Sequence, residues 1–151
     1  MTIKWQWGGL DDMTARQLYK LLAARSEVFV VEQNCVYQDM DGLDLEALHL
    51  VGWSDGELGA CLRLLAPGAK YAEASLGRVV TTKLVRGSGV GREMLSLAVR
   101  RLDQDYPTQP TRISAQAHLQ KFYSEFGFRT VSDEYLEDGI PHVEMLRPAS
   151  R

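Results

Sequence analysis

The sequence lacks the features that mark several large protein classes. No apolar run approaches the about 18 residues of a membrane-spanning helix. The first dozen residues, MTIKWQWGGLDD, have no apolar stretch of the kind found in secretory signals, so we expect a cytoplasmic protein without a membrane partner. The 17 lysine and arginine residues are outnumbered by 20 acidic ones, and a net charge of −3 argues against a general affinity for nucleic acid.

Cysteine is scarce, and no segment is rich enough in proline, glycine and serine to form a linker. The two cysteines, Cys35 and Cys61, have no CxxC spacing, which indicates reduced thiols rather than a disulfide or a redox motif. No histidine lies near Cys35 in the sequence to activate it, so we do not assign it as a nucleophile. A chain of 151 residues without a linker is expected to form a single domain over residues 1–151 with a substantial core.

Hydrophobic periodicity predicts the order strand, helix, three strands, helix, strand, helix, two strands. Thr14 and Gln17 form a capping box, the pair Asp55-Gly56 is typical of a hairpin, and Gly127 stands where a helix ends. Hairpins followed by a strand–helix–strand unit predict a mixed sheet in an α/β or α+β layer fold. The predicted strands cover residues 3–7, 49–53, 58–65, 73–82, 111–117 and two runs within 128–147; the helices cover about 14–29, a segment from the glycine-rich stretch to before Pro107, and 118–126.

Three glycines at alternate positions occur in VRGSGVGREML, residues 85–95, directly before a helical pattern. A Walker loop is excluded because Gly91 is followed by Arg92 and Glu93 rather than by lysine and a hydroxyl residue. The dinucleotide fingerprint is weak because Arg92 stands where its third glycine belongs. What remains is Arg86-x-x-Gly89-x-Gly91 at a helix start, where closely spaced amides and the helix dipole favour an anion such as a pyrophosphate.

A second cluster, AQAHLQKFYSEFGF, follows about 30 residues later and places Phe122 and Tyr123 on a short helix ended by glycine. Together the two clusters resemble the GNAT superfamily of acyl-CoA-dependent N-acetyltransferases, and the resemblance covers nearly the whole chain. The segments RSEVFVVEQNCVYQDMDGLD, LGRVV and EDGIPHVEM are similar to its ElaA-type branch. The resemblance implies a mixed, mostly antiparallel central sheet of about six to seven strands flanked by helices.

The same resemblance implies acetyl-CoA as co-substrate and assigns residues to it. Tyr123 matches the tyrosine that protonates the departing thiolate, a task that suits a phenol. The strand before the glycine loop lends backbone groups to the pantetheine arm, and one of its N–H groups would stabilise the developing oxyanion. By position, the residues that bind the cofactor are Val79, Val80, Thr81, Arg86, Gly87, Ser88, Gly89, Val90, Gly91 and Arg92.

The acceptor side is less well marked. Candidates for the general base are Glu32, Asp41, His142 and a water chain, and we favour Glu32 because it follows an apolar helix end and would be half buried. Asp41 lies in the acidic stretch QDMDGLDLE, which would attract a cationic amine. Arg78 and His142 are the other expected substrate contacts. The acidic stretch fails the EF-hand pattern and the histidines share no ligand spacing, so no metal site is expected.

The sequence therefore predicts an N-acetyltransferase that joins acetyl-CoA and a primary amine, of a small molecule or a peptide, in a ternary complex. An acyl-CoA-binding sensor without turnover and a nucleotide-binding module are the alternatives. The sequence does not identify the amine or the acyl group, and no residues mark a dimer surface, although many relatives of this fold pair through their sheets.

Overall fold

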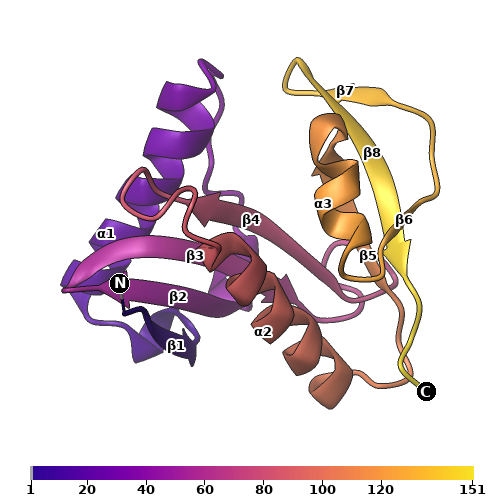
Figure 1. The fold of residues 1–151 in the computed structure, drawn as a ribbon, viewed down its shortest axis with the longest axis horizontal. Helices are drawn as coiled ribbons and strands as arrows, with labels where there is room; N and C mark the ends of the chain where they lie inside the picture. Colours follow the sequence, from indigo (N-terminus) through magenta and orange to yellow (C-terminus); the bar gives the residue numbers. More distant parts are fainter. Residues whose placement is uncertain (1) are drawn as a thin grey trace.

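The computed structural model describes residues 2–151 and contains two four-stranded sheets that open away from each other (Figure 1). In the first sheet the strands run in the order β1-β2-β3-β4, and every neighbouring pair is antiparallel. In the second, β8 pairs with β5, β6 and β7, again antiparallel. The strands are β1 (Lys4–Gly8), β2 (Leu48–Ser54), β3 (Glu57–Leu65), β4 (Ser75–Thr81), β5 (Thr111–Gln116), β6 (Arg129–Thr130), β7 (Tyr135–Glu137) and β8 (Ile140–Arg147).

The predicted α/β fold class is confirmed, whereas the single central sheet is replaced by two. The sheets meet where β4 begins: Ala74 and Thr111 form a parallel bridge, and the Arg112 N–H donates to the Ala74 carbonyl at 2.9 Å. Beyond this point β4 and β5 diverge (Figure 1). The sequence could not reveal this, because strand patterns are local and the pairing of β4 with β5 depends on tertiary packing.

The helices are α1 (Ala15–Ser26), α2 (Val90–Asp105) and α3 (Gln120–Ser124). The predicted capping box is present at α1, where Thr14 Oγ1 accepts from the Gln17 N–H at 3.1 Å. After α1 the chain continues as a wider π-helical turn over Glu27–Glu32, so the helical segment runs past the predicted end at residue 29. Within residues 2–151 no helix is both long and apolar enough to span a membrane.

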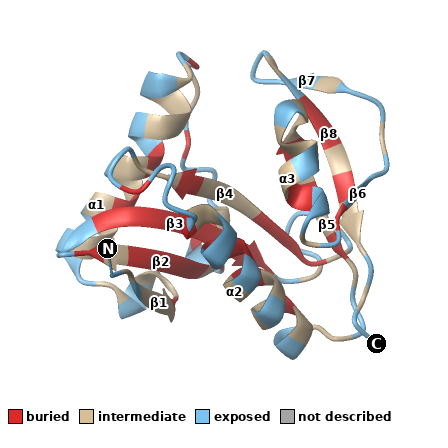
Figure 2. Cartoon of the chain, viewed as in Figure 1, coloured by how far each residue is buried: buried red, intermediate tan, exposed pale blue. Residues whose placement is uncertain are grey.

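The first sheet is buried on both faces, one covered by α1 and the other by α2. Since side chains alternate along a strand, Leu62 of β3 packs in the cluster with Met94 of α2, while its neighbour Cys61 packs with Leu21 of α1. Figure 2 shows the resulting band of buried residues along β2 and β3. This double cover explains why β3 is apolar nearly throughout instead of alternating.

The predicted Asp-Gly turn after β2, and a second Asp-Gly pair between the two final strands, both form tight hairpin turns. Asp55 and Gly56 have φ of 49° and 79°, and Asp138 and Gly139 have φ of 51° and 77°, the left-handed pair that two-residue hairpins prefer. The second turn joins β7 to β8. The two final strands predicted within residues 128–147 are in fact three, because the short β6 also pairs with β8.

Candidate active site

The glycine loop has the backbone conformation that its composition predicts. Gly87 and Gly89 have φ of 81° and 84°, a region that other residues enter only with strain. Gly89 is the N-cap of α2, so the first amides of this 16-residue helix have no partner inside the helix. The loop and the helix start line a cleft of about 380 Å³ together with Val79, Phe122 and Tyr123. Unpaired amides and the positive end of the helix dipole make this cleft suitable for a pyrophosphate.

Both arginines of the loop are held by carboxylates. Arg86 donates from Nη2 to Glu32 Oε1 at 2.6 Å and from Nε to the Thr81 carbonyl at 2.9 Å. Arg92 makes two hydrogen bonds to Glu125, at 3.0 and 3.2 Å. Each guanidinium is therefore placed at the rim of the cleft, and its carboxylate partner would compete with an incoming anion.

The strand before the loop contains a bulge. The ladder pairs Cys61 with Val80 and Arg63 with Gly77, so two residues of β4, Arg78 and Val79, lie opposite one residue of β3. Arg78 has φ of 50°, which is unusual for a residue other than glycine. Such a bulge leaves a residue unpaired with the neighbouring strand. Backbone groups near Val79 are thus available in the part of β4 that has already separated from β5.

Tyr123 is buried beside this bulge. It lies on α3 with 6% of its surface exposed and packs edge-on against the rings of Phe122 and Phe128. Burial raises the pKa of its phenol above the usual value of about 10. The hydroxyl therefore stays protonated at neutral pH and can act as a proton donor.

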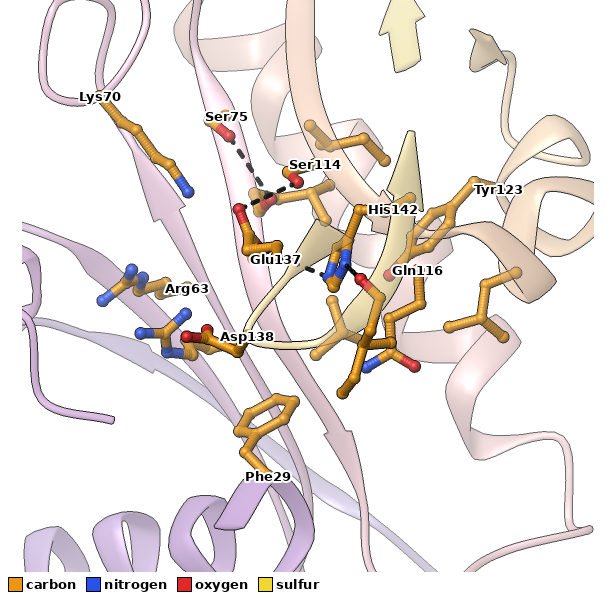
Figure 3. Close-up of a pocket in the computed structure, with 18 of the residues that line it drawn as sticks. Phe29, Arg63, Lys70, Ser75, Ser114, Gln116, Tyr123, Glu137, Asp138 and His142 are labelled. Carbon is orange, nitrogen blue, oxygen red and sulfur yellow. Dashed lines mark hydrogen bonds and ion pairs between the residues drawn. The ribbon is translucent and has the colours of Figure 1, made fainter. Parts of the chain in front are cut away.

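A second hollow, of about 120 Å³, opens between the two sheets (Figure 3). Its walls include Phe29 of the π-helical turn, Arg78 of β4 and His142 of β8. Val79, Leu119 and Tyr123 line both this hollow and the cleft at the glycine loop. Two molecules, one in each hollow, would therefore meet at these three residues. We call the hollow between the sheets the acceptor cavity.

His142 is held in one orientation within the acceptor cavity. Its Nδ1 lies 2.7 Å from the Ile140 carbonyl, an acceptor, so this nitrogen carries a proton. Its Nε2 lies 3.3 Å from Glu137 Oε2 (Figure 3). The imidazole ring stacks on the ring of Tyr135. The Tyr135 hydroxyl in turn bonds to Ser114 Oγ at 2.5 Å.

A buried ion-pair network supports the other wall. Arg25 and Arg63 are 1% and 2% exposed, and both bind Asp44, at 2.7 and 3.0 Å. Burial opposes ionisation of Asp44, but hydrogen bonds from the two guanidiniums outweigh it and hold its pKa below the usual range. The complete network comprises Arg25, Arg63, Arg78, Asp39, Asp41 and Asp44.

The structure brings some of the predicted site residues together and separates others. Arg78 and His142, the two other predicted substrate contacts, both line the acceptor cavity. Glu32 lines neither that cavity nor the glycine-loop cleft; it pairs with Arg86 and borders a separate hollow. Its expected role as general base is therefore not supported by its position, because the helix continues past it and turns its carboxylate toward the loop.

Asp41 is also engaged elsewhere. Arg63 binds both of its carboxylate oxygens, at 2.8 and 2.6 Å, and these bonds hold its pKa well below the usual range. It would influence an acceptor only through Arg63 and Arg78, since it does not line the cavity. Of the expected cofactor contacts, the Val80 side chain packs in the core toward α1, and Ser88 bonds to the Val85 carbonyl.

Several cavity residues had no assigned role in the sequence. Glu137 could have been found from the Asp-Gly turn. A two-residue hairpin at this turn pairs Glu137 with Ile140 and Tyr135 with His142, so Glu137 lies near His142. Lys70, on the loop between β3 and β4, carries no signal of this kind. Cys35, a free thiol as expected, also lines the cavity and donates to the Asp138 carbonyl at 3.3 Å.

The chain is similar in sequence and in structure to known proteins. A family model described as an acetyltransferase (GNAT) domain matches residues 10–147. A UPF0039 protein of Synechocystis is 45% identical over 147 residues, which cover 97% of this chain and 96% of that protein. The ElaA protein of Escherichia coli is 43% identical over 147 residues, 96% of each chain. The crystal structure of an acyl-CoA N-acyltransferase from Pseudomonas aeruginosa superimposes with a TM-score of 0.91 at 44% identity, covering 97% of this chain and 99% of that one.

Proposed function

Because the chain belongs to the GNAT acetyltransferase family, we propose that it transfers the acetyl group of acetyl-CoA directly to a small primary amine in a ternary complex. Members of this family are acyltransferases, and the resemblance of the sequence to the superfamily and its ElaA-type branch is confirmed. The observation that carries the proposal is the meeting of the two hollows at Val79, Leu119 and Tyr123. Direct transfer requires both reactants to be held together at one point.

The glycine-loop cleft fits coenzyme A. The amides of Gly89, Val90 and Gly91 would bind the pyrophosphate, and Arg86 and Arg92 at the rim would add charge. The free edge of β4 offers backbone N–H and C=O groups to the pantetheine arm, because the amides of that arm are themselves hydrogen-bond donors and acceptors. Bound acetyl-CoA supplies a thioester, the activated acyl group of the reaction.

We assign the general base to His142. An ammonium group must lose a proton before its nitrogen can attack a carbonyl carbon. With the proton of the imidazole on Nδ1, Nε2 can accept the proton of the amine, and Glu137 lies where it can stabilise the imidazolium that results. The nitrogen then forms a bond to the acyl carbon as the carbon–sulfur bond breaks, and it loses its second proton to water.

The remaining two tasks fall to Val79 and Tyr123. The Val79 N–H, at the bulge, is our candidate for the donor that stabilises negative charge on the thioester oxygen. The Tyr123 hydroxyl would give its proton to the departing thiolate and regain one from solvent or from His142. Because Tyr123 is buried, the pKa of its hydroxyl is raised and the hydroxyl keeps its proton until the thiolate forms.

The test is release of free CoA, followed with a thiol reagent, over a panel of amines from polyamines to amino acids and peptides. For the best amine we expect Tyr123→Phe and His142→Gln each to lower kcat by about 10²–10⁴-fold. His118→Gln is the matched control, because His118 is exposed and lines neither hollow; its kcat should stay within about threefold of wild type.

Two results would contradict the proposal. If coenzyme A raises the melting temperature but no amine is acetylated, the protein is better described as a CoA-binding sensor. If His142→Gln and His118→Gln lose equally little activity, transfer occurs but His142 is not the base.

A further inference from the structure

The acceptor cavity differs in chemistry from one end to the other. At one end Val79, Leu119 and Tyr123 also line the coenzyme cleft, and Figure 3 shows His142 on the same side of the cavity as Tyr123. This is the reacting end. The other end is bordered by Lys70, and Figure 3 shows Lys70 entering from the side of the cavity away from Tyr123.

Lys70 is the positive charge of this cavity that the protein does not neutralise itself. It is exposed, its ammonium lies 5.4 Å from the centre of the Tyr71 ring, and no carboxylate in residues 2–151 is within ion-pair distance of it. The neighbouring Arg63 and Arg78 belong to a network in which each guanidinium has a carboxylate partner. An anion that enters the cavity would therefore find its strongest free partner at Lys70.

The arginines next to Lys70 have hydrogen-bond donors to spare. Within the described chain the Nε atoms of Arg63 and Arg78 are buried and have no hydrogen-bond acceptor. Arg78 Nε lies 2.8 Å from Asp39 Oδ1, but its N–H is not directed at that oxygen. Arg78 is further held between the rings of Phe29 and Tyr37, about 6 Å from each. The charges of this wall are balanced by Asp39, Asp41 and Asp44, but the two buried Nε–H groups remain donors without an acceptor.

Building on the proposed function, we propose that the acceptor is a free amino acid. Its amine lies at the Tyr123–His142 end of the acceptor cavity, and its carboxylate is held at the Lys70 end beside Arg63 and Arg78. A small cavity fits this class: its volume of about 120 Å³ is below the roughly 300–1,000 Å³ typical of drug-sized ligands. A carboxylate bound at one end fixes the distance of the amine from the thioester, which direct transfer requires.

Asp138 lines the same cavity as Lys70 and carries the opposite charge. It forms no ion pair within residues 2–151, and its carbonyl is bound by Cys35, which places the hairpin tip against the cavity. A substrate carboxylate would be repelled by Asp138 and attracted by Lys70. Removing either charge should therefore change carboxylate recognition in opposite directions.

The experiment compares each free amino acid with its α-carboxamide and with the amine obtained by removing the carboxyl group. For wild type, kcat/KM for the acid should exceed that for the two analogues by about tenfold or more, mainly through KM, since the lost contact serves binding. Tripeptides with free and amidated C-termini are included, and both should be poorer substrates than the free amino acid.

Three variants test the assignment. Lys70→Gln should reduce the preference for the acid about tenfold, and Asp138→Asn should increase it severalfold. Asparagine is suited to this turn because it tolerates positive φ before glycine. Lys4→Gln, an exposed lysine on β1 outside the cavity, should leave the preference unchanged.

The inference is overturned if wild type acetylates carboxamides, amines or peptides as well as free acids, or if Lys70→Gln retains the preference. In those cases acetyl transfer still occurs and the proposed function stands. Absence of transfer to every amine, with coenzyme A still bound, refutes the proposed function and this inference with it.

Discussion

Substituting Asp44 by asparagine removes one charge from the centre of the buried ion-pair network. Asp44 is 6% exposed, and its carboxylate accepts from Arg25 at 2.7 and 3.0 Å and from Arg63 at 3.0 Å. Asparagine has nearly the same volume and retains one carbonyl oxygen, so packing is preserved. The change therefore isolates the loss of charge, together with the hydrogen bonds that depend on it.

The expected cost follows from what each arginine retains. Removing one partner of a buried ion pair costs about 3–5 kcal/mol when the other charge is left alone. Here Arg25 keeps Asp39 at 2.8 Å and Arg63 keeps Asp41 at 2.6 Å, so the lower end applies. A loss of about 3 kcal/mol corresponds to a fall of roughly 6–12 °C in the Tm of a chain of this size.

The assay is equilibrium unfolding in urea at several pH values. Because the native pKa of Asp44 lies below its unfolded value of about 3.9, its stabilisation is complete above about pH 5 and is lost as the pH falls through the native pKa. The difference between wild type and Asp44→Asn should thus be largest near pH 7 and should shrink below pH 4.

Asp105→Asn is the matched control. Asp105 pairs with Arg101 four residues earlier on α2, and the two side chains are 36% and 33% exposed, so its loss should cost about 0.3–0.5 kcal/mol. If the two asparagine variants unfold at the same urea concentration, the buried network does not stabilise the fold as argued here.

Two further substitutions test the coenzyme cleft. Gly89→Ala adds a Cβ that meets no atom within 4 Å, so only the φ of 84° at this residue opposes the substitution. We expect a loss of about 1–2 kcal/mol in the free energy of unfolding and weaker binding of CoA by calorimetry. Gly9→Ala, at a residue with negative φ, should change neither. Glu32→Gln frees Arg86 for the pyrophosphate, so the Kd for CoA should fall severalfold with kcat within about threefold of wild type. A loss of kcat by 10²-fold or more in Glu32→Gln would instead restore Glu32 as the general base.

Local signals in the sequence predicted most of the elements. The capping box at Thr14, the turn glycines and the glycine loop act over a few residues, so they can be recognised without knowledge of the fold. The proposed coenzyme cleft could be located for the same reason, because a loop followed by a helix supplies its own amides and dipole. Of residues 85–91, all except Ser88 line the cleft.

The ion-pair partners of the residues predicted for the acceptor side could not be predicted in this way. Glu32 and Asp41 were chosen from their neighbours in sequence, but each is bound by an arginine from a distant strand or loop: Arg86 for the first, Arg63 for the second. A carboxylate that already forms an ion pair with an arginine of the protein attracts a cationic ligand less strongly than an unpaired one does. That pairing is decided by tertiary packing, which sequence periodicity does not describe.

The sequence by itself determined the order of strands and helices, the tight turns and the conformation of the glycine loop, because each depends on backbone preferences and hydrophobic spacing within a short segment. Only the tertiary structure decided that β4 and β5 separate after Ala74, and that His142, Lys70 and Arg78 border one cavity. These three residues come from two different sheets and a connecting loop. Their proximity arises from the way the sheets pack against their helices, which is a property of the whole chain rather than of any segment.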